Sequence, residues 1–187
     1  SETASGREAL YRCFRDVAGF TSVWNKLFRR DLLDWHRLRF ESIPISDEQY
    51  VSSLAMVFAE RVAVVDRPFV SYRFHTGSSQ ADGRAGHPEA AYLATYSIVD
   101  RMREAGIYED VKRSYLNMAM RLMREYFDKM PEYRTMKFLY DTYCSEVFPR
   151  IGAEDLPDGY FHDPRIGDWY RLIRDCTLEE ILFRVSR

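Results

Sequence analysis

The chain has 187 residues, 46% hydrophobic and 15% aromatic, with a formal net charge of −2 at pH 7. This composition predicts a folded protein with a sizeable core and argues against intrinsic disorder. The near balance of 27 basic and 29 acidic side chains gives no overall positive field, so we expect no nucleic-acid partner.

The first half of the chain predicts several short elements. Residues 7–17 place apolar side chains at helical spacing, and a short helical turn is predicted at 29–33 after an extended segment. Ser46 and Gln49 have the spacing of a capping box, in which each side chain satisfies a backbone N–H of the first helical turn. This spacing predicts a helix over about 46–60.

Two runs rich in β-branched and aromatic residues follow this helix. Residues 61–65 and 69–74 are separated by Asp66-Arg67-Pro68, which predicts two short strands joined as a β-hairpin. Proline cannot donate a backbone hydrogen bond, so Pro68 is expected at an edge or at the entry to a strand. Residues 76–86 are small and polar, which indicates a loop and an internal boundary near residue 80.

The second half of the chain is predicted to be helical. One helix begins near Pro88 and ends at Gly106, and a second continues to about Met130. Apolar side chains keep strict helical spacing along the second helix, at Val111, Tyr115, Met118, Leu122 and Tyr126.

Further helices are predicted over 131–148 and 168–173, with a loop rich in Gly, Pro and Asp between them. Thr177 and Glu180 again have capping-box spacing, which predicts a last helix. The expected fold is therefore α+β and mainly helical, with a small β-hairpin element. It is divided into regions 1–80 and 81–187.

The residue types that hold transition metals are scattered along the chain. Cys13, Cys144 and Cys176 lie far apart in amphipathic stretches, which predicts reduced thiols of a cytoplasmic protein. The four histidines form no metal-ligand spacing, so no metal site is expected. The apolar runs are too short to span a bilayer, and the polar start gives no export signal. Any membrane contact is therefore expected to be peripheral, at the inner face.

Three segments carry the strongest functional signal: Val23-Trp24-Asn25-Lys26-Leu27, Ser46-Asp47-Glu48-Gln49-Tyr50 and Ser71-Tyr72-Arg73-Phe74-His75. In that order they resemble the acceptor-side half of a family 2 glycosyltransferase of the inverting, GT-A type. The resemblance implies that 1–80 is the C-terminal part of the catalytic domain. Nothing before residue 20 resembles the nucleotide-binding half with its Asp-x-Asp motif. We therefore expect a fragment that is inactive alone and a hexosyltransferase when complete.

The resemblance implies that Asp47 is the catalytic base, because the family places an acidic pair just before a helix. Ser46 replaces the first acid of that pair, and an extra acid, Glu48, follows. An aspartate at a helix N-terminus is also explained by the helix dipole alone. Both interpretations of Asp47 stay open at this stage.

The resemblance also implies a substrate-binding set. Lys26 would pair with a carboxylate or phosphate and Trp24 would form a wall or sugar platform, although a tryptophan beside a strand is more often core. The leaving diphosphate would be held by Arg73, His75, Ser78 and Ser79. Taken alone, that His and those serines are typical of a solvated turn.

The complete enzyme is expected to use a nucleotide-sugar donor and a glycan acceptor in cell-surface polysaccharide biosynthesis. A divalent metal, Mn or Mg, is expected with the missing half, and no cofactor with this chain. The alternative is a noncatalytic helical protein-interaction module. The enzyme hypothesis requires Asp47, Lys26 and Arg73 to converge on one cleft, whereas the module allows them to scatter. We also hypothesise that apolar surface left by a missing half drives self-association.

Overall fold

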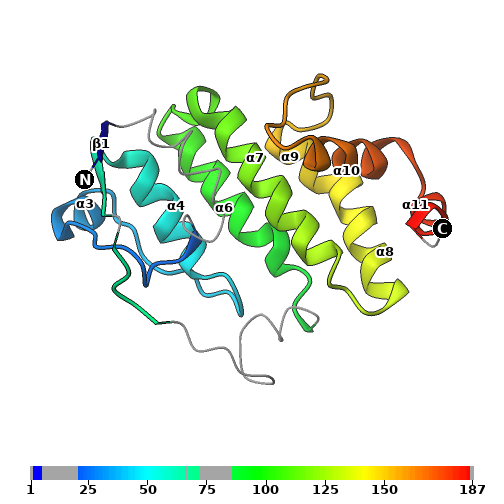
Figure 1. The fold of residues 1–187 in the computed structure, drawn as a ribbon, viewed down its shortest axis with the longest axis horizontal. Helices are drawn as coiled ribbons and strands as arrows, with labels where there is room; N and C mark the ends of the chain where they lie inside the picture. Colours follow the sequence, from blue (N-terminus) through cyan, green and yellow to red (C-terminus); the bar gives the residue numbers. More distant parts are fainter. Residues whose placement is uncertain (1, 6–20, 66, 72–85, 186–187) are drawn as a thin grey trace.

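The computed structural model describes residues 2–5, 21–65, 67–71 and 86–185. These residues form a mainly helical α+β fold with one small β element, which confirms the predicted fold class. The β element and α3 lie at one end of the long axis, α4, α6 and α7 follow along it, and α11 lies at the other end (Figure 1). Their bounds are β1 Glu2–Ser5, α3 Arg30–Trp35, α4 Glu48–Phe58, β2 Arg61–Val64, α6 Ala90–Glu104, α7 Tyr108–Phe127, α8 Tyr133–Thr142, η2 Tyr143–Val147, α9 Phe148–Ile151, α10 Pro164–Asp175 and α11 Leu178–Val185.

The β element differs from the predicted hairpin. β2 is a strand as expected, but its antiparallel partner is β1, with Glu2 opposite Val64 and Ser5 opposite Arg61. Residues 69–71 form no strand, and the rest of the predicted second strand, 72–74, lies outside the described residues. A physical reason is that Pro68 supplies no N–H to a ladder where the return strand would begin.

The start of α4 also differs from the prediction. The helix begins at Glu48, and no side chain caps it. Ser46 adopts a left-handed backbone conformation with φ +69°, outside the extended region from which an N-cap side chain reaches the helix. Its hydroxyl instead lies 2.9 Å from the hydroxyl of Tyr126 in α7. The predicted capping box of Ser46 and Gln49 is therefore wrong.

The second predicted capping box is confirmed at the start of α11. The backbone N–H of Thr177 donates to Glu180 Oε2 at 2.8 Å, and the N–H of Glu180 donates to Thr177 Oγ1 at 3.3 Å. Here both partners are local and exposed, so no distant group competes for them.

The helix predicted from 131 to 148 exists as one continuous run from Tyr133 to Ile151. It contains a π-helical turn, Tyr143–Val147, between α8 and α9. Just before this turn, the Thr142 hydroxyl donates to the Phe138 carbonyl at 2.7 Å. Such side-chain bonds to the preceding turn compete with the regular helical ladder. The run ends at Gly152, whose φ of +65° suits glycine.

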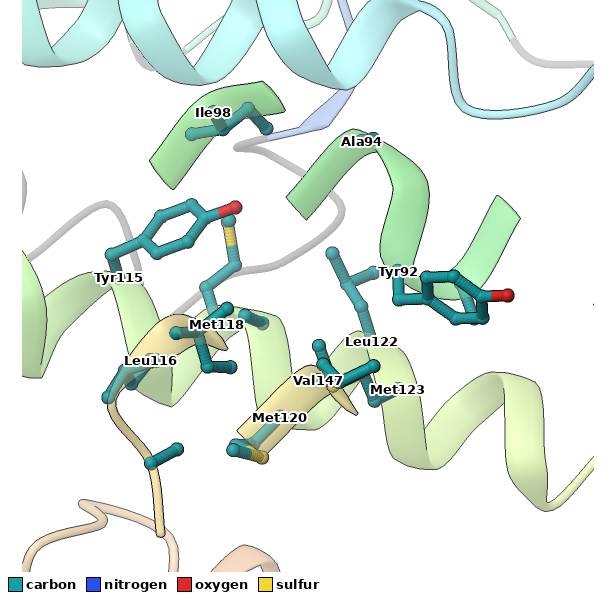
Figure 2. Packing of buried hydrophobic residues seen from close by; sticks show 14 of the residues in the cluster. Tyr92, Ala94, Ile98, Tyr115, Leu116, Met118, Met120, Leu122, Met123 and Val147 are labelled. Carbon is teal, nitrogen blue, oxygen red and sulfur yellow. The ribbon is translucent and has the colours of Figure 1, made fainter. Parts of the chain in front are cut away.

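The two central helices, α6 and α7, form an antiparallel pair. A three-residue connection, 105–107, contains Gly106 at φ +69° and reverses the chain. The stripe of apolar residues predicted for α7 is buried throughout. Figure 2 shows side chains of both helices gathered in this core, among them Tyr92, Ala94, Ile98, Tyr115, Met118 and Leu122.

A single cluster of buried apolar side chains joins the described parts of both halves. It extends from Leu38 and Leu54 through Ile98 to Ile173 and Ile181. α4 packs on α6, which packs on α7, and α7 packs on α10 (Figure 1). The first half therefore shares its core with the helical second half, across the boundary placed near residue 80.

Replacement of Thr177 with Ala removes one side of the capping box of α11. We expect the free energy of unfolding to fall by about 1 kcal/mol, because one N–H of the first turn loses its acceptor. Urea denaturation monitored by circular dichroism measures this change. Ser114→Ala, in the interior of α7, is the control and should leave stability within about 0.5 kcal/mol of the unmodified chain.

Candidate functional site

An open groove lies at the β-strand end of the molecule. Its lining includes residues 24–29, with α3 residues Asp31, Leu32 and Trp35. The end of α4, β2 and residues 65 and 67–70 also belong to the lining. Local structure sets this shape, because the chain turns from α4 directly into β2, and residues 65 and 67–71 after it form no helix or strand.

The groove exposes large apolar side chains. Leu27 is fully exposed, and Trp35 and Phe69 are 84% and 72% exposed. Trp24, Val65 and Val70 on the same lining are each about half exposed. A contiguous apolar surface of this kind marks an interaction site or a ligand-binding groove.

Aromatic stacking joins the groove to the helical core. The rings of His36 and Phe58, both on the lining, stack with centroids 4.1 Å apart and planes 4° apart. The Arg101 guanidinium of α6 lies 5.6 Å from the Phe58 centroid and donates to the His36 carbonyl at 3.5 Å. Burial, and then the charge of Arg101, lower the pKa of His36. The imidazole is therefore neutral at pH 7.

The described lining carries more positive than negative charge. Arg29 forms an ion pair with Asp31, and this hydrogen bond lowers the pKa of Asp31. The other charged lining residues are Lys26, Arg61, Arg67 and Glu60. Cations beside exposed aromatic rings suit a ligand with an anionic group and a flat apolar face.

Two of the residues predicted from the sequence, Trp24 and Lys26, lie on the groove lining. The Lys26 ammonium donates to the Ser22 carbonyl at 2.5 Å and to Asn25 Oδ1 at 2.7 Å. These bonds hold the ammonium close to the turn formed by residues 22–26. Trp24 is 47% exposed, so part of its ring is open to a ligand rather than buried in the core.

The two acids at the start of α4 lie next to this turn but are not part of the groove lining. Burial, and then the neighbouring Asp47, raise the pKa of Glu48. The Lys26 charge and a hydrogen bond from the Val23 backbone N–H act in the opposite direction. The acid coupled to Lys26 is therefore Glu48, while Asp47 is half-buried beside it.

The remaining predicted binding residues, Arg73, His75, Ser78 and Ser79, lie outside the described residues. Within the described ranges, no three His, Cys, Asp or Glu side chains are grouped closely enough to hold a metal ion. No helix in that part of the chain is long and apolar enough to cross a bilayer.

Sequence reasoning missed several residues that form the groove, chiefly Trp35, Phe69, Arg61 and Arg67. The sequence contained one signal of this surface, the continuous apolar run at 62–65. Such a run predicts a strand that is covered on both faces. In the structure Val64 is 53% exposed. An uncovered apolar strand of this kind indicates a contact surface.

Comparison with known proteins gives one partial similarity. The chain is 38% identical over 65 residues to the protein named "Putative glycosyltransferase EpsH" of Bacillus subtilis (strain 168). This match covers 33% of the chain and 18% of that protein, so it spans less than a fifth of the curated relative. No protein-family model matches the chain, and no solved structure matches it. The similarity supports a relationship to glycosyltransferases over a third of the chain.

Replacement of Lys26 with Gln tests the coupling between the groove and α4. Because the Lys26 charge favours the ionised form of Glu48, its removal should raise the pKa of Glu48 further. An NMR titration of the Glu48 side-chain carboxyl carbon measures this shift. Arg29→Gln removes another groove cation and should leave the pKa of Glu48 unchanged. An unaltered titration in Lys26→Gln would contradict the coupling.

Proposed function

We propose that this chain is the acceptor-side part of an inverting family 2 glycosyltransferase of the GT-A type. The complete enzyme moves a sugar from a nucleotide donor to a cell-surface glycan at the cytoplasmic face of the membrane. The similarity to a protein named as a glycosyltransferase supports the reaction class. The charge interaction of Lys26 with Glu48, the residue that follows Asp47, beside a groove with exposed aromatic rings, carries the proposal.

In the proposed reaction, the Asp47 carboxylate removes the proton from an acceptor hydroxyl. The hydroxyl oxygen forms a bond to C1 of the donor sugar. The bond from C1 to the diphosphate oxygen breaks, and its electron pair leaves with the nucleotide diphosphate. Attack from the face opposite the leaving group inverts the configuration at C1. The Ser22 carbonyl and Asn25 Oδ1 hold the Lys26 ammonium beside the groove.

The positive groups of the groove oppose the charge of the leaving diphosphate. Lys26, Arg61 and Arg67 are the described candidates, and positive groups at a developing negative charge lower the barrier to its departure. Arg73, His75, Ser78 and Ser79 stay proposed for the same task. The described residues offer no ligand set for Mn or Mg, and we propose that the nucleotide-binding half holds the metal.

The exposed apolar part of the groove is assigned to protein contact. In this proposal, a nucleotide-binding half on further polypeptide covers Leu27, Trp35 and Phe69, whose exposure is otherwise costly in water. Without that half, the 187-residue chain binds no donor. Incubation of the chain with uridine-diphosphate sugars and a glycan acceptor should give no product, and turnover by the chain would refute this division.

Asp47→Asn in the complete polypeptide tests the assignment of the base. We expect kcat to fall by about 10²–10⁴-fold, while the donor KM changes by less than about twofold, because only proton removal is lost. Steady-state kinetics measure both values. Asp155→Asn, in an exposed loop, is the matched control and should retain full activity. Full turnover by Asp47→Asn would move the base elsewhere, with Glu48 the first candidate.

A second candidate function is a noncatalytic interaction module, favoured by the exposed apolar lining of the groove. In that case Trp24 and Lys26 serve a protein contact, and the surface also allows self-association. Calorimetric titration of the complete polypeptide with uridine diphosphate separates the two functions. Binding supports the transferase, whereas no binding to any nucleoside diphosphate supports the module.

A further inference from the structure

We infer that Tyr126 is a positioning residue, through which the helical second half fixes the turn that carries Asp47. This inference rests on the proposed function, because Asp47 is the base only in that proposal. Tyr126 lies in α7 and Ser46 immediately precedes Asp47 in the chain. Their hydroxyl oxygens are 2.9 Å apart, and the two residues are only 1% and 8% exposed.

The bond meets the chain where its backbone is strained. Ser46 has φ +69°, a left-handed conformation that costs free energy for any residue with a side chain. The following residue, Asp47, returns to helical angles with φ −54° and ψ −31°. The Ser46 carbonyl then accepts from the Gln49 N–H at 3.0 Å, as the first bond into α4. The conformation of Ser46 therefore sets the direction in which the chain enters Asp47.

The Asp47 side chain makes no capping hydrogen bond to α4. An aspartate at this position usually directs its carboxylate to the N–H groups of the first turn. Without that bond, the position of the carboxylate depends more directly on the backbone at 46–47. A base must stay within hydrogen-bonding reach of the hydroxyl it deprotonates, so rigidity at Ser46 matters directly for transfer.

Tyr126 is suited to hold this turn because its surroundings are packed. The neighbouring α7 residues Leu122, Met123 and Phe127 are buried, and α7 packs against both α6 and α10. A side chain locked in this way holds its hydroxyl at a fixed point, as a support to a functional group requires. Ile45, also buried, anchors the chain just before the turn.

Tyr126→Phe tests the inference by removing a single oxygen atom. In the 187-residue chain, we expect hydrogen exchange of the Gln49 amide to accelerate by about tenfold, because the turn loses its clamp. The amide resonances of Asp47 and Glu48 should also shift. The matched control is Tyr108→Phe, which removes a buried hydroxyl of the same helix that donates to the Ile151 carbonyl at 2.6 Å. This control should leave the hydrogen exchange of Gln49 and the amide resonances of Asp47 and Glu48 unchanged.

The kinetic test of Tyr126 uses the complete polypeptide. We expect Tyr126→Phe to lower kcat by about tenfold with the donor KM within about twofold, since misplacement of the base affects the chemical step. Ser46→Ala should do the same, and the double variant should lose no more than either single variant, because both remove the hydrogen bond that joins Ser46 to Tyr126. Tyr108→Phe should retain kcat even where it lowers the melting temperature.

The outcomes separate this inference from the proposed function. Unchanged hydrogen exchange and amide resonances in Tyr126→Phe would overturn the role of Tyr126. So would an unchanged kcat when these resonances shift. Neither result would contradict the proposed transferase function. Additive losses in the double variant would also overturn it. A complete polypeptide that transfers no sugar with any donor would overturn the proposed function and, with it, the catalytic role of Tyr126.

Discussion

The buried face of α7 is the constraint on which the rest of the described structure depends. This helix packs against α6 on one side and α10 on another, and its apolar stripe lies in the continuous core. α4 joins the same core through α6, so the chain that enters α4 is held by helices from the second half. The bond between Ser46 and Tyr126 adds a polar contact to this apolar attachment, at a turn where the backbone is left-handed just before α4.

This arrangement gives the two ends of the molecule different surfaces. Around α7 the large side chains are buried, whereas Leu27, Trp35 and Phe69 stand exposed along the groove. The groove lining carries more positive than negative charge, although the whole chain has a net charge of −2. Binding of an anion here is therefore a local property, set by which side chains the fold brings to one surface. The contacts of Phe58 with His36 and Arg101 join that surface to α6.

The two capping-box sequences show when a local sequence pattern is enough to predict hydrogen bonds. At Thr177 and Glu180 the spacing gave the observed hydrogen bonds, because both partners lie within one exposed turn. At Ser46 the same spacing failed, because a tyrosine distant in sequence takes the hydroxyl and the backbone turns left-handed. The site shows the same division. Trp24 and Lys26, both on the groove lining, were predicted from one local segment, but the charge interaction of Lys26 with Glu48 depends on how α4 packs.

The sequence by itself determined the helical character, the buried stripe of α7 and the turn at Gly106, since helical spacing and glycine are local signals. Only the tertiary structure decided that β2 pairs with Glu2–Ser5, that Ser46 bonds Tyr126, and that apolar side chains from three segments line one groove. Strand partners and buried polar bonds join residues far apart in the chain. Their choice depends on how whole elements pack together, and local residue spacing does not specify that packing.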